Sequence, residues 1–360
     1  MRILAYTTTK MDKERLYDII AGSLIGGAAG DALGYEVEFN SLANIERRYG
    51  QEGIRHYVLH GDKALISDDT QMTLFTAYAL TRLNGRPYDH AEALAEIGKA
   101  YLAWYRTQGG SAESCPHCPL EDIKALRCRR APGVTCLTAL ETMSKGGIPY
   151  NDSKGCGGAM RVAPIALYAL GRDDMDENDV ALLAGDAARL THRHPLGFIS
   201  AAYLATLMYI SHDDDYSHNS FPEKVLLLNN DASKILKACY GPTYESDINI
   251  MFWLVSHAFQ HFVDDNSKPI DNIRSLGEGW VGEEAVAIAY YCALKNSTDF
   301  SEAIRMAVNH DGDSDSTGAI CGNILGAHIG YKNLPDCWKD KLELHDTILD
   351  IARQLVQIKD

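Results

Sequence analysis

Two stripes of glycine are the feature that most constrains how this chain can fold. Glycine recurs at every fourth position in residues 22–34 and again in residues 318–330. Each glycine inside a helix costs on the order of 1 kcal/mol relative to alanine, so a stripe of them needs compensation. Close approach of two backbones along the stripe is the usual compensation. The stripes therefore predict two central helices that pack tightly against neighbours and hold the loops at their ends in fixed positions.

Helical periodicity also dominates the rest of the chain. Apolar residues recur at spacings of three and four, as on one face of an amphipathic helix. This pattern predicts helices over residues 72–83, 94–105, 160–170, 179–190, 196–210, 221–240, 248–262, 281–295, 301–308, 317–329 and 342–357. Short strands are predicted only at 2–6 and 54–58. No linker divides the chain, so we expect one all-α domain over residues 12–360 after a short extension, residues 1–11.

Composition excludes several classes of function. The formal net charge of -15 argues against binding of nucleic acid through its phosphates. No uncharged stretch reaches the roughly 20 residues that a membrane span requires, and the first residues show no secretory signal. Nine cysteines, an odd number, are typical of cytosolic thiols, so we expect a cytoplasmic protein. A structural zinc site is left open as an alternative at four of them, Cys115, Cys118, Cys128 and Cys136.

Two acidic clusters, at residues 67–70 and 311–317, stand immediately before apolar helical runs. One such cluster would be an ordinary N-cap, because Ser, Thr and Asp satisfy the unpaired N–H groups of a helix start. Two clusters with more aspartate than capping requires indicate a shared site for hard divalent cations, which prefer oxygen ligands. An EF-hand does not fit, because Gly312 stands second in that loop rather than sixth, and Gly322 occupies the twelfth position in place of glutamate.

The charges of these clusters match a binuclear site. Four carboxylates, those of Asp68, Asp69, Asp313 and Asp315, would balance two divalent cations. Without metal they would repel one another, and some would have to protonate. The positive end of the helix dipole helps to hold carboxylates at such positions. From spacing alone, metal binding and simple capping with solvated acids are both open.

Five motifs follow one another in order along the chain. They are residues 30–38 (GDALGYEVE), 67–70 (SDDT), 155–164 (GCGGAMRVAP), 191–195 (THRHP) and 312–318 (GDSDSTG). Together they resemble the ADP-ribosylglycohydrolases of the dinitrogenase-reductase-activating type, over nearly the whole chain. The resemblance implies a single large orthogonal helical domain with a binuclear metal cleft. Its implied cofactors are two Mg²⁺, or Mn²⁺ in their place, held by Ser67, Asp68, Asp69, Asp313, Asp315 and Ser316.

The resemblance also implies a reaction, hydrolysis of the bond between the distal ribose of ADP-ribose and a protein side chain, most of all arginine. Glu38 is the predicted catalytic carboxylate, together with Asp315, and Glu36 is its competitor two residues earlier. The predicted substrate-binding residues are Asp31, Gly155, Gly157, Gly158, Met160, His192 and Trp280. The sequence departs from the common family pattern at Ser316, which replaces Thr and keeps a hydroxyl, and at Cys156, which replaces Asn and removes an amide.

Two other functions compete with this one. The first is a binding protein without turnover, such as a partner that occludes an ADP-ribosyltransferase toxin and confers immunity, or a crystallin-like member. The second is a metal-dependent phosphoesterase that cleaves the diphosphate of ADP-ribose. Free ADP-ribose as the product, rather than AMP with ribose phosphate, separates the hydrolase from the phosphoesterase. We expect ADP-ribose and an ADP-ribosylated protein as ligands, with selectivity set by loops 109–132 and 212–222.

Overall fold

The computed structural model describes residues 11–113, 115–213, 216, 218–264 and 266–356. Within these residues the regular secondary structure is helical, and no β-strand is present. The predicted strand at 2–6 and nearly all of the 1–11 extension lie outside the described residues. The α-helices are α1 (Lys13–Gly34), α2 (Leu42–Tyr49), α3 (Asp68–Thr81), α4 (His90–Thr107), α5 (Val134–Ser144), α6 (Ala163–Leu170), α7 (Glu177–Arg189), α8 (Pro195–Ile210), α9 (Phe221–Tyr240), α10 (Glu245–Asp264), α11 (Pro269–Leu276), α12 (Gly282–Lys295), α13 (Phe300–Val308), α14 (Ser314–Ile329), α15 (Asp336–Lys339) and α16 (His345–Val356). Short 3₁₀ turns connect several of them.

The all-α prediction is confirmed, and most predicted helices lie within a few residues of the observed ones. The predicted helix at 221–240 coincides with α9. Four short helices were missed, α2, α5, α11 and α15. The predicted strand at 54–58 is wrong, because this segment is irregular and pairs with no strand. Instead, Asn309 anchors it through hydrogen bonds to both the N–H and the carbonyl of Ile54.

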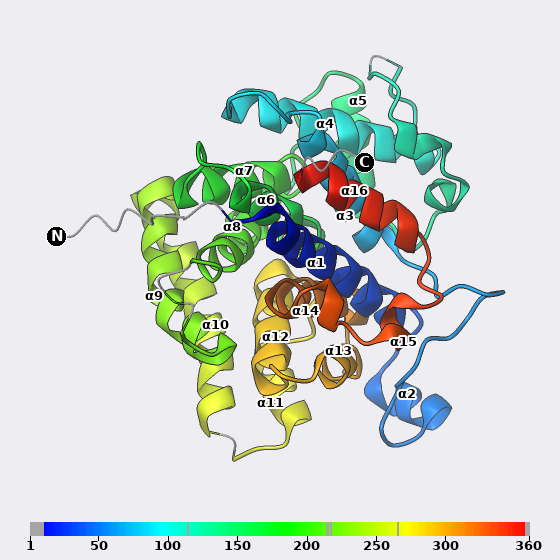
Figure 1. The fold of residues 1–360 in the computed structure, drawn as a ribbon, viewed down its shortest axis with the longest axis vertical. Helices are drawn as coiled ribbons and strands as arrows, with labels where there is room; N and C mark the ends of the chain where they lie inside the picture. The colour runs from blue at the N-terminus through cyan, green and yellow to red at the C-terminus, as the bar shows by residue number, and fades with distance from the viewer. Residues whose placement is uncertain (1–10, 114, 214–215, 217, 265, 357–360) are drawn as a thin grey trace.

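The two glycine stripes lie on α1 and α14, and they face each other. Helix α1 runs through the centre of the molecule with α14 beside it (Figure 1). A methyl group built on Gly26 would overlap the carbonyl oxygen of Gly322, and Gly22 and Gly30 make the same contact with Gly326 and Gly318. The pairing runs in opposite directions along the two helices, so they are antiparallel. The tight packing predicted for each glycine stripe is therefore a direct contact between the stripe on α1 and the stripe on α14.

This contact continues to the ends of the helices. Gly34, the last residue of α1, lies so close to Ser314, the first residue of α14, that any side chain on it would overlap the Ser314 carbonyl oxygen. The chain that leaves α1 therefore passes directly beside the start of α14. Helix α1 also contacts α3, whose N-terminus follows the first acidic cluster. The fold thus brings the acidic motifs to one place.

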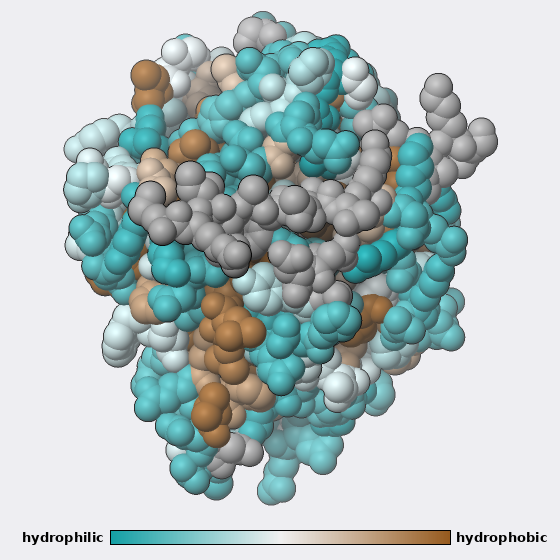
Figure 2. Space-filling view, turned by 60° about the vertical axis from the view of Figure 1, so that its left-hand side comes forward, coloured by the Kyte–Doolittle hydropathy of each residue, from teal (hydrophilic) through white to brown (hydrophobic). Residues whose placement is uncertain are grey.

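The outer surface is mostly hydrophilic. In Figure 2, apolar side chains form a narrow column on the lower part of the face that includes α9 and α10. The large apolar side chains exposed on these two helices are those of Leu227, Ile250, Trp253 and Val263. Among the described residues, no helix is both long and apolar enough to cross a membrane.

The glycine contact predicts a specific loss of stability. Gly322→Ala places a methyl group against the carbonyl of Gly26, so the two helices must separate. We expect the free energy of unfolding to fall by about 1–3 kcal/mol, the usual cost of overpacking, as measured by urea denaturation. The matched control is Gly98→Ala in α4, where the nearest atom lies 3.9 Å from the added carbon. That variant should gain up to about 1 kcal/mol from helix propensity. Equal stabilities for the two variants would show that close approach is not required.

Candidate metal and substrate site

Asp31 fixes the start of helix α3 from the last turn of α1. Its carboxylate is fully buried and accepts hydrogen bonds from the N–H groups of Ser67 and Thr70 and from the Thr70 hydroxyl. Both carboxylate oxygens are therefore occupied by the protein. Asp31 was predicted to bind substrate, and the structure places it behind the acidic motif, where it holds that motif in position.

The first acidic motif begins α3 with Ser67 as its N-cap. The Ser67 hydroxyl accepts a hydrogen bond from the Asp69 N–H at 3.2 Å. Asp68 accepts one at 3.1 Å from the N–H of Gly133. Asp69 is 3% exposed, and its Oδ1 atom has no hydrogen-bond partner. A buried carboxylate oxygen without a partner is costly, because it has lost its water and gained nothing in exchange.

The second acidic motif begins α14 in the same way. Asp313 is the N-cap, and its Oδ1 accepts a hydrogen bond from the Ser316 N–H at 3.2 Å. Asp315 accepts a second bond from the same N–H at 3.0 Å. Asp313, Asp315 and Ser316 are all buried. Asp311 points elsewhere, because its carboxylate binds the N–H of Leu42 at the start of α2.

The two motifs share one electrostatic environment. Burial raises the pKa of Asp68, Asp69 and Asp313 well above that of free aspartate, and the charge of Asp315 raises each of them further. Burial, with the charge of Asp315, likewise raises the pKa of Asp31 to about 7. The carboxylates of the two motifs therefore lie close enough to influence one another.

The carboxylates lie near one another but do not form a complete metal-coordination site. Within the described ranges, no three His, Cys, Asp or Glu side chains are arranged so that they could hold a metal ion. The donor set nevertheless fits hard divalent cations, since oxygen ligands predominate and Asp69 presents a buried oxygen without a partner. Binding would require these side chains to turn toward a common point. The binuclear centre stays a prediction.

Glu38 and Glu36 have different surroundings. Glu36 binds Arg48 at 2.7 Å and His60 at 3.0 Å, so its carboxylate is engaged in surface ion pairs. The Oε2 atom of Glu38 is buried and has no hydrogen-bond partner. Burial raises the pKa of Glu38 to about 11, and the charges of Asp315, Asp313 and Asp68 add to the effect. Glu38 therefore lies with the acidic motifs, as predicted, and Glu36 does not.

Two stacked aromatic rings, those of Phe39 and Trp280, lie beside the turn that carries Glu38. Phe39 has a left-handed backbone with φ of 63° and is exposed. Its ring stacks on that of Trp280, with 5.4 Å between centroids and 17° between planes. The sequence predicted Trp280 near the substrate, and the stacked ring places it beside the turn that carries Glu38. Phe39 was missed, because one aromatic residue in a turn gives no signal of its partner.

The glycine loop at 155–158 is held by backbone contacts. The N–H of Cys156 donates to the Trp280 carbonyl at 3.1 Å, and the N–H of Gly282 donates to the Lys154 carbonyl at 2.9 Å. The Nε2 atom of His192 would lie only 3.4 Å from a side-chain carbon on either Gly155 or Gly157. His192 is 2% exposed, and burial, with the charge of Arg161, lowers its pKa to about 3. His192, predicted to bind substrate, thus lies as a neutral packing residue beneath the loop.

The loop joins the second acidic motif through sulfur. The Cys156 thiol donates to Asp313 Oδ2 at 2.7 Å, and the Ser316 hydroxyl donates to Cys156 Sγ at 3.5 Å. Burial raises the pKa of the Cys156 thiol well above its usual value, and the negative charges of Asp313 and Asp69 contribute. Met160 is buried next to Ser316, with 4.0 Å between its sulfur and the Ser316 hydroxyl oxygen. Sequence spacing gave no indication of the contact between Cys156 and Asp313.

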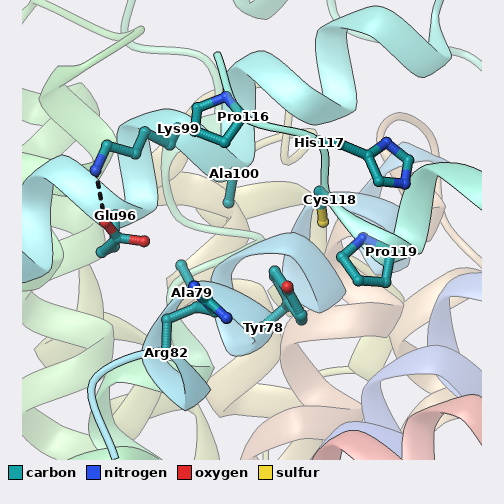
Figure 3. Close-up of a pocket in the computed structure, with 10 residues that line it drawn as sticks. All are labelled: Tyr78, Ala79, Arg82, Glu96, Lys99, Ala100, Pro116, His117, Cys118 and Pro119. Carbon is teal, nitrogen blue, oxygen red and sulfur yellow. Dashed lines mark hydrogen bonds and ion pairs between the residues drawn. The ribbon is translucent and has the colours of Figure 1, made fainter.

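Other features lie away from this cluster. A cavity of about 340 Å³ is lined by Tyr78 of α3 and Arg82 just after it, by Lys99 of α4 and by Cys118 (Figure 3). Tyr78 stands ten residues along α3 from Asp68, about 15 Å at 1.5 Å per residue. Zinc at these cysteines gains no support, because the described residues contain no group of three or more His, Cys, Asp or Glu that could hold a metal ion there. The predicted selectivity loop at 212–222 begins at His212, which contacts Ala327 at the far end of α14.

Comparison with known proteins decides the family. The sequence model of the ADP-ribosylglycohydrolases matches residues 12–360. The chain belongs to the ADP-ribosylglycohydrolase family. This confirms the predicted class of enzyme, a glycohydrolase, and the general reaction of that family, hydrolytic removal of ADP-ribose.

Individual relatives and a solved structure agree with the family assignment. The chain is 25% identical to ADP-ribosylhydrolase ARH1 of Dictyostelium discoideum, over 93% of each chain. It is also 25% identical to the ADP-ribosyl-[dinitrogen reductase] glycohydrolase of Rhodospirillum rubrum, over 91% of this chain and 92% of the relative. A solved structure described as an ADP-ribosylglycohydrolase-related protein complex superposes with a TM-score of 0.56 at 25% identity, covering 96% and 99% of the two chains.

The raised pKa of Glu38 predicts a pH dependence of stability. A carboxyl group whose pKa is raised by folding keeps its proton in the folded state after the unfolded state has lost it, so stability falls as pH rises. In EDTA, between pH 7 and 8.5, the free energy of unfolding should fall by up to about 1.4 kcal/mol per pH unit from this group. Glu38→Gln should flatten the slope, as measured by urea denaturation at several pH values. An unchanged slope in the variant would contradict the assignment.

Proposed function

We propose that this glycohydrolase releases ADP-ribose from modified protein side chains, above all from arginine, in a Mg²⁺-dependent reaction. The observation that carries the proposal is the meeting of two carboxylate-bearing helix starts with Glu38, which has a buried and unpartnered oxygen. Family membership supports the reaction class. The name of the Rhodospirillum rubrum relative describes a glycohydrolase whose substrate is an ADP-ribosylated protein.

Two Mg²⁺ ions, or Mn²⁺ in their place, would be held by the hydroxyl and carboxylate groups at the two helix starts. The ligands would be Ser67, Asp68 and Asp69 of α3 with Asp313, Asp315 and Ser316 of α14. When bound, such cations orient ribose hydroxyls and lower the pKa of a bound water. Several buried carboxylates with raised pKa values, one of them with an unpartnered oxygen, support cation binding, since a divalent ion removes both penalties.

Glu38 is the residue that handles the proton. Its carboxyl group lies next to the acidic motifs with a raised pKa, so without cations it keeps its proton and can give one to a leaving group. Bound divalent cations would lower that pKa and let it take a proton from an attacking water. Asp315, which influences every other carboxylate of the cluster, adds negative charge where an oxocarbenium-like transition state develops positive charge. The two predicted catalytic roles are thus distinct.

The rest of the site suits the remainder of the ligand. Gly155, Gly157 and Gly158 carry no side chains, so their backbone can approach a diphosphate closely. Trp280, which is 36% exposed and stacked on Phe39, offers an aromatic face at the rim. Substrate contacts through these residues are part of the proposal.

Electrostatics favours arginine over serine as the modified residue. An ADP-ribosylated arginine keeps a positive guanidinium group beside the scissile bond, whereas an ADP-ribosylated serine has only a neutral ether oxygen there. The two cations would balance the four carboxylates of the metal site, but the protein as a whole carries a net charge of -15. Its overall field attracts the cationic substrate and does not act on the neutral one.

The pair of glutamates gives a matched test of the catalytic role. Glu38→Gln should lower kcat by about 10²–10⁴-fold, the usual contribution of general acid–base catalysis. Binding of ADP-ribose, measured by calorimetry, should persist because the substitution preserves shape. Glu36→Gln is the control and should keep its activity, since Glu36 binds only Arg48 and His60, with a weak contact to Tyr49. Full activity of Glu38→Gln would transfer the role to another group.

The reaction itself is tested with defined substrates. We expect release of intact ADP-ribose from an arginine-ADP-ribosylated protein with Mg²⁺, none with EDTA, and slower release from a serine-linked substrate, with products identified by mass spectrometry. Asp315→Asn should abolish release, because it removes both a proposed metal ligand and a charge. AMP with ribose phosphate as products would indicate the phosphoesterase instead. Tight ADP-ribose binding without any release would indicate a binding protein, such as an immunity partner.

A further inference from the structure

We propose that residues 148–152 form an open strand edge that pairs with an extended segment of the ADP-ribosylated protein, next to the modified side chain. The inference rests on the proposed function and deepens it, because it states how the protein part of the substrate is bound. The segment follows the turn after α5 and leads into the glycine loop at 155–158.

The segment has the alternation of a strand, although no strand among the described residues pairs with it. It runs without a turn or a bend. Ile148 is 79% exposed, Tyr150 is 101% exposed and Asp152 is also exposed, whereas Pro149 is buried. Exposure that alternates with a period of two is typical of an extended chain, in which successive side chains point to opposite sides.

One edge of the segment is held by the THRHP motif at 191–195. The Asn151 side-chain amide donates to the Thr191 carbonyl at 2.8 Å, and its oxygen accepts from the Arg193 N–H at 3.1 Å. The Arg193 side chain donates to the Pro149 carbonyl at 3.0 Å. These bonds fix the segment against the body of the protein, so its extended form exists before any partner binds.

The opposite edge is open. Among the described residues, no group forms a hydrogen bond with the backbone N–H or carbonyl of Ile148, Tyr150 or Asp152. Alternate residues of an extended chain direct these groups to the same edge, and such a row is a template for pairing with another chain. Only an extended polypeptide supplies donors and acceptors at the same spacing, so the edge suits strand addition by a peptide.

Continuity with the proposed site indicates which polypeptide this is. Tyr150 stands six residues before Cys156, at most about 20 Å along an extended chain. The Cys156 thiol binds Asp313, a proposed metal ligand. A modified arginine that enters the site leaves its own backbone just outside, beside this segment. The exposed carboxylate of Asp152 and the net charge of -15 favour a neutral or basic segment there.

Two substrates that differ only in their polypeptide part test the inference. They are free ADP-ribosyl-arginine and a flexible peptide that carries the same group, each assayed with Mg²⁺. Ile148→Ser/Tyr150→Ser should raise KM for the peptide about 2–30-fold, because two cross-strand side-chain contacts are lost. It should leave kcat for the peptide unchanged, as expected for a loss of uniform binding. Both constants for free ADP-ribosyl-arginine should also stay unchanged.

A double variant on another surface supplies the control. Leu227→Ser/Ile250→Ser removes two apolar side chains of α9 and α10 that are 56% and 47% exposed. It should act on both substrates as the unaltered protein does. Both double variants alter exposed side chains, so their melting temperatures should stay close to that of the unaltered protein.

Methylation of the peptide backbone tests the hydrogen bonds themselves. Each N-methyl group removes one N–H, and only alternate residues of an added strand face the edge with which they pair. Methylation at alternate peptide residues should therefore raise KM about 2–10-fold each, the value of one net hydrogen bond. Methylation at the residues between them should leave KM unchanged. The same alternation should persist in Ile148→Ser/Tyr150→Ser, because this variant keeps the backbone of the edge.

The contrary outcomes are distinct. An unchanged KM for the peptide in Ile148→Ser/Tyr150→Ser, or methylation effects without alternation, would overturn the inference and leave the proposed function intact. Equal losses on both substrates would overturn it as well, since the segment would then bind ADP-ribose itself. A dimer seen by sedimentation and lost in this variant would assign the edge to a second copy of the chain instead. Release from neither substrate by the unaltered protein would overturn the proposed function too.

Discussion

Direct backbone contact between α1 and α14 is the constraint on which the site depends. Any side chain on Gly26 or Gly322 would overlap the opposite helix, so the close separation of the two axes requires glycine at these positions. Because the helices are antiparallel, the end of α1 and the start of α14 coincide at Gly34 and Ser314. Asp31, one turn before that end, then reaches the start of α3. Three helix termini converge through one packing contact, and the acidic motifs follow from that convergence.

The convergence concentrates negative charge where the protein supplies little to offset it. Two cations flank the motifs, but Arg130 pairs with Glu343 and Lys154 pairs with Glu283. The fully buried Arg161 is turned toward the ring of Tyr101, with its centre 4.3 Å from the ring centroid. The carboxylates must therefore hold protons or meet a cation from solution. This is the physical reason that a metal-dependent reaction fits the site better than capping alone.

Structural features that depend on residues within one segment could be predicted from the sequence. Features that depend on contacts between residues far apart in the chain could not. Helix α9 and the glycine stripes follow from periodicity within one segment, and the acidic motifs were found because each begins a helix. The short helices α2, α5, α11 and α15 were missed because few residues give a weak periodic signal. The segment at 54–58 was wrongly predicted as a strand because its backbone is bound by Asn309, a side chain distant in the sequence. The contacts of Asp31 could not be predicted for the same reason, since its partners lie at the start of another helix.

Cys156 links the glycine loop to the start of α14, although the loop itself is held in place by other contacts. The loop around it is fixed by backbone hydrogen bonds to residues 280–282 and by glycines that pack on His192, and neither depends on the side chain at 156. A substitution there is therefore tolerated structurally and acts only on what the side chain faces. That side chain faces Asp313 and Ser316, the start of α14. The contact thus joins the glycine loop to the start of α14 through a side chain, and a substitution at position 156 should change this contact before it changes the fold.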